Sequence, residues 1–139
     1  MRLAARFHIT WEDDNTLRVE SDYGMQTRLF HFNAAPSTPP GERTWQGYSS
    51  AQWERPASLK VATTNLRAGY LRKNGVPYSE NAAVTEYFDI APIPSGGQVL
   101  LVTAIVDDPQ NLRQPFTTSS QFKKEADGSK WDPQRCTVK

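Results

Sequence analysis

Short runs of alternating apolar and polar residues, rich in β-branched and aromatic side chains, recur along the whole chain and end at Asn, Asp, Gly or Pro. This pattern is typical of half-buried β-strands, in which successive side chains point to opposite faces of a sheet. Apolar residues at the helical spacing i, i+3, i+4, i+7 do not continue over three turns anywhere in the chain. The sequence therefore predicts an all-β protein.

The connections between the runs indicate how the strands are arranged. The pattern predicts eight strands, at 5–12, 16–22, 25–32, 45–53, 58–65, 82–90, 98–108 and 116–127. Short connections make neighbouring strands antiparallel, and closing a sheet removes its unpaired edges. We therefore expect about eight antiparallel strands in an up-and-down, lipocalin-like barrel, with a two-sheet β-sandwich as the alternative.

The remaining segments lie between or after these strands in what we expect to be a single domain of residues 1–139. Residues 33–43 are rich in Pro and are expected to form a surface loop. Residues 66–81 contain Asn74–Gly75 and Pro77, which predict an excursion from the barrel. Residues 128–139 form a C-terminal tail that Trp131 is expected to anchor.

Charge and composition exclude several classes of function. Sixteen basic and fifteen acidic side chains give a net charge of +1, which argues against a nucleic-acid or membrane partner. The single cysteine, Cys136, permits neither an intrachain disulfide nor a metal site of four thiolate ligands. The chain has no nucleotide-binding motif, so we expect no cofactor. With two histidines and one cysteine, a closed zinc site would need carboxylates for most of its ligands, so we expect no metal. The first ten residues lack the apolar region of a signal peptide, which predicts a cytoplasmic location for the chain as written.

Two stretches, GYLRKNGVPYSENA (69–82) and DDPQNLRQPFTTSSQFKKE (107–125), carry a family resemblance that extends over residues 6–136. The chain resembles an uncharacterised bacterial family of hypothetical proteins, usually exported, from soil and environmental bacteria. The resemblance implies a periplasmic or secreted location if this chain is a truncated form of an exported member. It implies no catalytic residues.

The two histidines are the candidate acid–base groups near neutral pH. His8 and His31 lie on the first and third predicted strands, and Glu20 lies on the strand between them. If the large aromatic side chains mark the core, both histidines point outwards. If the barrel has a polar interior, both point inwards beside Glu20 and form a candidate catalytic set, because alternation alone does not reveal which face is buried.

Aromatic residues provide a second candidate site. Trp45 and Trp53 share one strand face with Gly47, Ser49 and Ala51, so small residues lie between two large rings. Such a gap is what a ligand cup requires, although the taper of a barrel requires it too. The predicted ligand-binding residues are Trp45, Tyr48, Trp53, Tyr70, Arg72 and Tyr87.

Three functions are consistent with these features. The first is a small-molecule-binding barrel whose aromatic-lined cavity takes a small, partly apolar ligand. The second is a small promiscuous hydrolase of esters or phosphoesters that uses a His/carboxylate pair in the barrel. The third is a structural domain that forms a homodimer by strand exchange.

Overall fold

A computed structural model describes residues 5–33, 41–71 and 75–137 of the chain. This part of the chain is all-β, and no helix in it is long and apolar enough to cross a membrane. Its strands are β1 (Phe7–Asp13), β2 (Thr16–Ser21), β3 (Gln26–Phe32), β4 (Tyr48–Arg55), β5 (Ser58–Thr64), β6 (Gly69–Tyr70), β7 (Pro77–Tyr78), β8 (Ala83–Pro92), β9 (Gln98–Asp107) and β10 (Phe116–Lys123).

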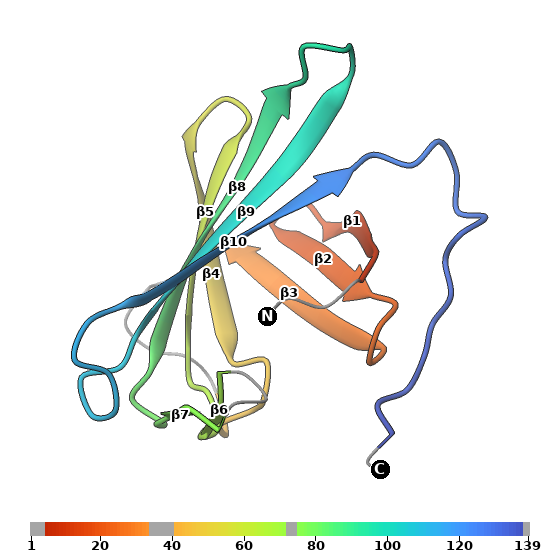
Figure 1. The fold of residues 1–139 in the computed structure, drawn as a ribbon. Coiled ribbons are helices and arrows are strands. Elements are labelled where there is room, and N and C mark those ends of the chain that lie inside the picture. Colours follow the sequence, from red (N-terminus) through yellow and green to blue (C-terminus); the bar gives the residue numbers. More distant parts are fainter. Residues whose placement is uncertain (1–4, 34–40, 72–74, 138–139) are drawn as a thin grey trace.

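Eight of these strands form one strongly curled sheet in the order β1-β2-β3-β4-β5-β8-β9-β10 (Figure 1). The predicted excursion at 66–81 contains β6 and β7, and among the described residues these two strands pair only with each other. All strand pairs in the large sheet are antiparallel except β3 with β4, which run parallel. The sheet is therefore mixed.

The expectation of an up-and-down barrel is wrong in this respect, and the connection between β3 and β4 explains why. A parallel pair requires a connection of about a dozen residues or more, because the chain must return to the end from which it started. Residues 33–47 provide that length. The sequence prediction treated the Pro-rich part of this segment as a surface loop; residues 34–40 lie outside the described residues.

The ladder of hydrogen bonds also does not close into a barrel. The strand order begins with β1 and ends with β10, and no pairing joins these two edges among the described residues. The sheet is a half-barrel with a concave and a convex face (Figure 1). The edges approach each other through side chains, since the ring centroids of Phe7 on β1 and Phe122 on β10 are 4.5 Å apart.

The hydrophobic core lies on the concave face, where the alternating pattern places the larger apolar side chains. Its buried members come from five strands, and Phe30 and Val61 are completely inaccessible to solvent. Phe30 packs against Phe88 across the curl, with ring centroids 5.4 Å apart. The cluster comprises Val19, Phe30, Ala51, Leu59, Val61 and Phe88. This packing fixes which face of each strand is inside.

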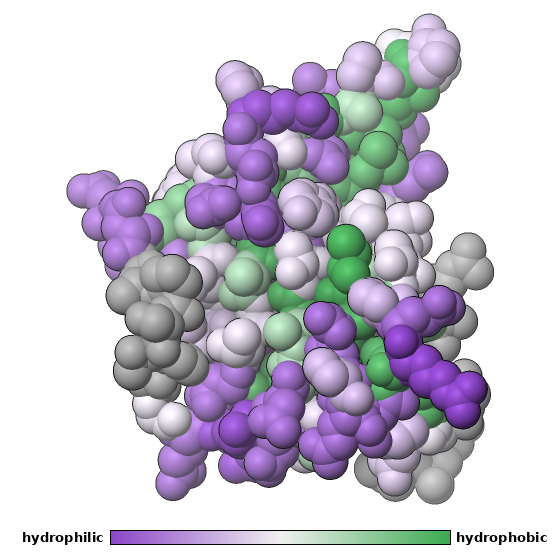
Figure 2. All heavy atoms as spheres, turned by 90° about the vertical axis from the view of Figure 1, so that its left-hand side faces the viewer, coloured by the Kyte–Doolittle hydropathy of each residue, from purple (hydrophilic) through white to green (hydrophobic). Residues whose placement is uncertain are grey.

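The convex face is less polar than a simple alternation predicts. On β9 the outward positions include Val99, Leu101 and Ile105, all half-buried. Figure 2 shows a hydrophobic band that descends from the projecting β8–β9 hairpin between hydrophilic side chains.

The C-terminal tail leaves β10 and passes along the outer side of β1–β3 (Figure 1). Gly24 donates its backbone N–H to the carbonyl oxygen of Gln134 at 2.7 Å, and Gln134 donates to the carbonyl oxygen of Asp22 at 2.8 Å. Trp131 lies edge-on to His8, with ring centroids 5.9 Å apart. The tail thus links the end of β10 to the turn between β2 and β3.

Candidate ligand cavity

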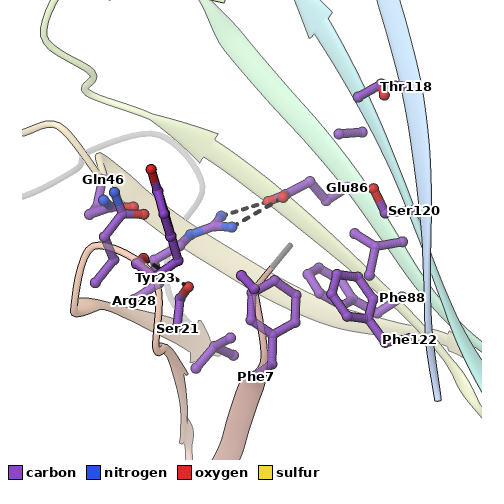
Figure 3. Close-up of a pocket in the computed structure, with 15 residues that line it drawn as sticks. Phe7, Ser21, Tyr23, Arg28, Gln46, Glu86, Phe88, Thr118, Ser120 and Phe122 are labelled. Carbon is purple, nitrogen blue, oxygen red and sulfur yellow. Dashed lines mark hydrogen bonds and ion pairs between the residues drawn. The ribbon is translucent and has the colours of Figure 1, made fainter. Parts of the chain in front are cut away.

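A cavity of about 220 Å³ lies on the concave face, between the β1–β3 side of the curl and the β8–β10 side. Figure 3 shows Phe7, Ser21 and Arg28 on one side and Glu86, Phe88, Ser120 and Phe122 on the other. The alternating pattern places these side chains there. Glu86 and Phe88 on β8 face the same way as their β9 partners Ala104 and Val102.

An ion pair crosses the cavity from β3 to β8. Arg28 donates from Nη2 to Oε2 of Glu86 at 2.6 Å and from Nη1 to Oε1 at 3.1 Å, although the two residues are 58 positions apart. The side chains are 22% and 12% exposed. A bidentate geometry with little water is the strong form of an arginine–carboxylate contact.

Two buried hydroxyl groups support the guanidinium from the strands in between. Arg28 Nη2 lies 3.2 Å from Thr63 Oγ1 on β5 and 3.4 Å from Ser49 Oγ on β4. Ser49 and Thr63 also hydrogen-bond to each other at 2.7 Å. Arg28 further stacks over the ring of Phe30, 4.9 Å from its centroid. These contacts hold the guanidinium in one position.

Arg28 also explains the gap that the sequence pattern indicated on β4. Ser49 and Ala51 do face the concave side, as the pattern predicts, but the space above Ser49 contains the guanidinium of Arg28. Gly47 is small for a different reason: a Cβ there would meet the carbonyl oxygen of Thr64 at 2.4 Å, and its φ is +65°.

Apolar side chains form a large part of the cavity wall, beside neutral polar residues such as Ser21 and Ser120. Phe7 and Phe122 meet at the seam between the sheet edges, and Phe88 joins the wall to the core. Val19 and Val102 complete this side. The site therefore combines apolar side chains with a small number of polar groups, among them the Arg28–Glu86 ion pair, as small-molecule sites generally do.

The predicted ligand-binding residues mostly lie elsewhere. Tyr48 faces outwards and stacks on His31, with ring centroids 4.7 Å apart. Tyr87 alternates with Glu86 and so points to the convex face. Tyr70 on β6 is 70% exposed, and Arg72 lies outside the described residues.

The two tryptophans of the predicted cup are also separated. Trp53 is on the concave side at the rim of the sheet, where it stacks on Phe32 at 5.9 Å. Phe32 in turn contacts Trp11 at 5.4 Å. Trp45 precedes β4 and is exposed, beneath the guanidinium of Arg67. None of the four described tryptophans lines the cavity.

The structure brings two of the three predicted catalytic residues together. His8 Nδ1 lies 3.3 Å from Glu20 Oε2, because the register pairs these positions on β1 and β2. Arg18 also contacts Glu20, at 3.3 Å. His31 is opposite Thr16, at the other end of β2. Both histidines are on the face opposite to Phe7 and Phe30, which is the convex face.

The ion pair was missed in the sequence, although a signal for it exists. Arg28 has the same strand parity as the aromatic residues Phe30 and Phe32, and Glu86 has the same parity as Phe88. A single charged residue on the apolar face of a strand requires a partner. Two such residues of opposite sign could therefore have been paired.

Two buried carboxylates lie away from the cavity. Burial raises the pKa of Asp108, but hydrogen bonds from Ser79, Asn111 and Gln110 outweigh burial and hold the pKa below its usual value. Burial likewise acts against ionisation of Asp22, and hydrogen bonds from Arg6 and Tyr23 lower its pKa overall. Asp108 organises the loop after β7, since it accepts hydrogen bonds from both N and Oγ of Ser79. We assign both carboxylates a structural role.

Among the residues that the structure describes, no group of three or more His, Cys, Asp or Glu side chains is arranged to hold a metal ion. Comparison of the chain with protein-family models, curated proteins and solved structures finds no match. The family resemblance therefore stays a prediction, and the function must be argued from the site itself.

Proposed function

We propose that the protein binds a small, partly apolar molecule in the concave-face cavity. The observation that carries this proposal is the 220 Å³ cavity, which has an apolar wall and a fixed ion pair. An engineered apolar cavity of about 150 Å³ accepts benzene, so this volume accommodates a ring with a polar substituent. Binding sites of this kind are usually formed before the ligand arrives.

The proposal is tested by filling the cavity from one strand. Ala104 lines the cavity, and the adjacent Thr103 points to the convex face. We expect Ala104→Leu to weaken the binding of one-ring aromatic molecules, as measured by NMR titration of the methyl signals of Val19 and Val102. Thr103→Leu is the matched control and leaves binding unchanged. The proposal fails if no member of an aromatic panel shifts these signals, or if the two variants behave alike.

A second candidate function is hydrolysis at the convex face, and the contact between His8 and Glu20 favours it. A carboxylate that orients an imidazole is a recurring part of general-base catalysis. The pair is open to water, because the His8 side chain is 60% exposed. A chromogenic panel of carboxyl, phosphate and sulfate esters and glycosides tests this candidate. Turnover that His8→Ala abolishes and His31→Ala retains would support it, and a flat panel would reject it for these substrates.

A further inference from the structure

The charges in the cavity are balanced before any ligand binds. Of the described residues that line it, Arg28 and Glu86 carry the formal charges at neutral pH, and they are bonded to each other. The other polar lining groups, among them Ser21, Gln26 and Ser120, are neutral. A charged ligand would therefore enter without a free counter-charge in this wall.

Arg28 nevertheless retains hydrogen-bonding capacity. A guanidinium has five N–H donors, one on Nε and two on each terminal nitrogen. Glu86, Thr63 and Ser49 accept from Nη2, and Glu86 also accepts from Nη1. Within the described part of the chain, the second Nη1 hydrogen and the Nε hydrogen of Arg28 have no acceptor. A neutral oxygen of a ligand can accept from such a donor without breaking the ion pair.

From the balanced charge and the spare donors together, we infer that the ligand is an uncharged molecule with one or two rings and a hydrogen-bond acceptor that meets Arg28. This inference rests on the proposed function. The rings contact the apolar wall at Phe7, Phe88 and Phe122. An anion would compete with Glu86 for the guanidinium and leave that carboxylate poorly partnered. A cation would do the same to Arg28, and a buried charge without a partner is unfavourable.

Three molecules of the same shape distinguish these cases: benzamide is neutral, benzoate is an anion and benzamidinium is a cation. Toluene is the control that lacks an acceptor. Dissociation constants are measured at pH 7 by NMR titration of the methyl signals of Val19, Val102 and Ala104. We expect benzamide to bind at least about tenfold more tightly than either ion, the ratio that corresponds to 1.4 kcal/mol. Toluene is expected to bind more weakly than benzamide.

The outcomes separate this inference from the function on which it rests. If either ion binds as tightly as benzamide, or toluene does, the inference is overturned while binding in the cavity stands. If none of the four shifts the methyl signals, the proposed function itself fails.

Two variants test the origin of the preference. Glu86→Gln leaves Arg28 with an uncompensated positive charge, so we expect benzoate to become the tightest ligand of the three. In the double variant Arg28→Met/Glu86→Leu the pair is replaced by apolar groups, and benzamide loses its advantage over toluene. Unchanged preferences in both variants would overturn the inference. If Glu86→Gln does not fold, the double variant carries the test, since its neutral side chains leave no buried charge unpaired.

Discussion

The rings of Phe7 and Phe122 meet at 4.5 Å and join β1 to β10, the two edges of a sheet whose hydrogen-bond ladder stays open between them. The contact closes the cavity wall at a place where no backbone pairing joins the described strands. Side-chain packing thus joins two sheet edges that backbone hydrogen bonds would join in a closed barrel.

We expect Phe7→Ala and Phe122→Ala each to lower the free energy of unfolding by about 1–2 kcal/mol, because both rings are half-buried. Their double variant should show a coupling of about 1 kcal/mol in urea unfolding. Leu66 is buried just after the end of β5, and the pair Phe122→Ala and Leu66→Ala is the control whose effects should add. Additivity of the Phe7 and Phe122 variants would contradict a direct contact at the seam.

Removing one partner of the ion pair should destabilise the fold strongly, whereas replacing both partners by apolar residues should change its stability little. Arg28→Met leaves the Glu86 carboxylate partly buried without its partner, so we expect a loss of about 3 kcal/mol in unfolding free energy. Arg28→Met/Glu86→Leu should recover most of this loss, since no charge remains to be desolvated. Urea unfolding at pH 7 measures both. A double variant less stable than the single one would show that the pair itself stabilises the fold.

Asp108 should make the free energy of unfolding depend on pH in the acidic range. Its pKa in the folded protein lies below the usual value of 3.8, so the folded state binds fewer protons than the unfolded state near that pH. The stabilisation is complete above about pH 4–5 and is lost as the pH falls through the lower, folded pKa. Asp108→Asn should cost about 2 kcal/mol at pH 7, and the difference from the native protein should shrink below about pH 4. A difference that stays constant from pH 7 to pH 2 would contradict this assignment.

The tail should be held by its backbone rather than by the side chain of Gln134. Gln134→Pro removes the N–H that donates to Asp22, whereas Gln134→Ala keeps it. Losing one hydrogen bond of about 1 kcal/mol should increase the hydrogen-exchange rate of the Gly24 amide by about fivefold in the Pro variant only. Equal exchange rates in the two variants would mean that the tail does not depend on this bond.

The histidines should have no influence on ligands in the cavity. His8 and His31 lie on the convex face, with Glu20 and Tyr48 as their neighbours. His8→Ala and His31→Ala should therefore leave the dissociation constant of benzamide unchanged within about twofold, in contrast to Ala104→Leu. A large loss of affinity in either histidine variant would place the ligand on the other face of the sheet.

The sequence predicted the strands well because strand formation depends on local alternation and on turn residues. All eight predicted strands are present in the sheet, with shifts of a few residues at their ends, as at β4 and β10. The face of each histidine was left open, because alternation has two equivalent assignments. The burial of Phe30 and Phe88 decides between them.

The structure separates the residues of the predicted aromatic site for a related reason. Its three residues on and before β4 are close in sequence, but they lie apart. Trp45 precedes the strand, Tyr48 is on its convex face and Trp53 is at the concave rim. Residues that line the cavity come instead from strands distant in sequence, such as Phe7 with Phe122 and Arg28 with Glu86. A local pattern contains no information about such distant pairs.

The sequence by itself determined that the chain is all-β, where its strands lie and which side chains share a face, since these follow from the two-residue period of an extended backbone. Only the tertiary structure decided that β4 joins β3 in parallel, that the sheet stays open and that Arg28 finds Glu86 across the cavity. Strand order and curl arise from the packing of residues far apart in the chain, and this packing brings two single charges of opposite sign together, so that each is compensated.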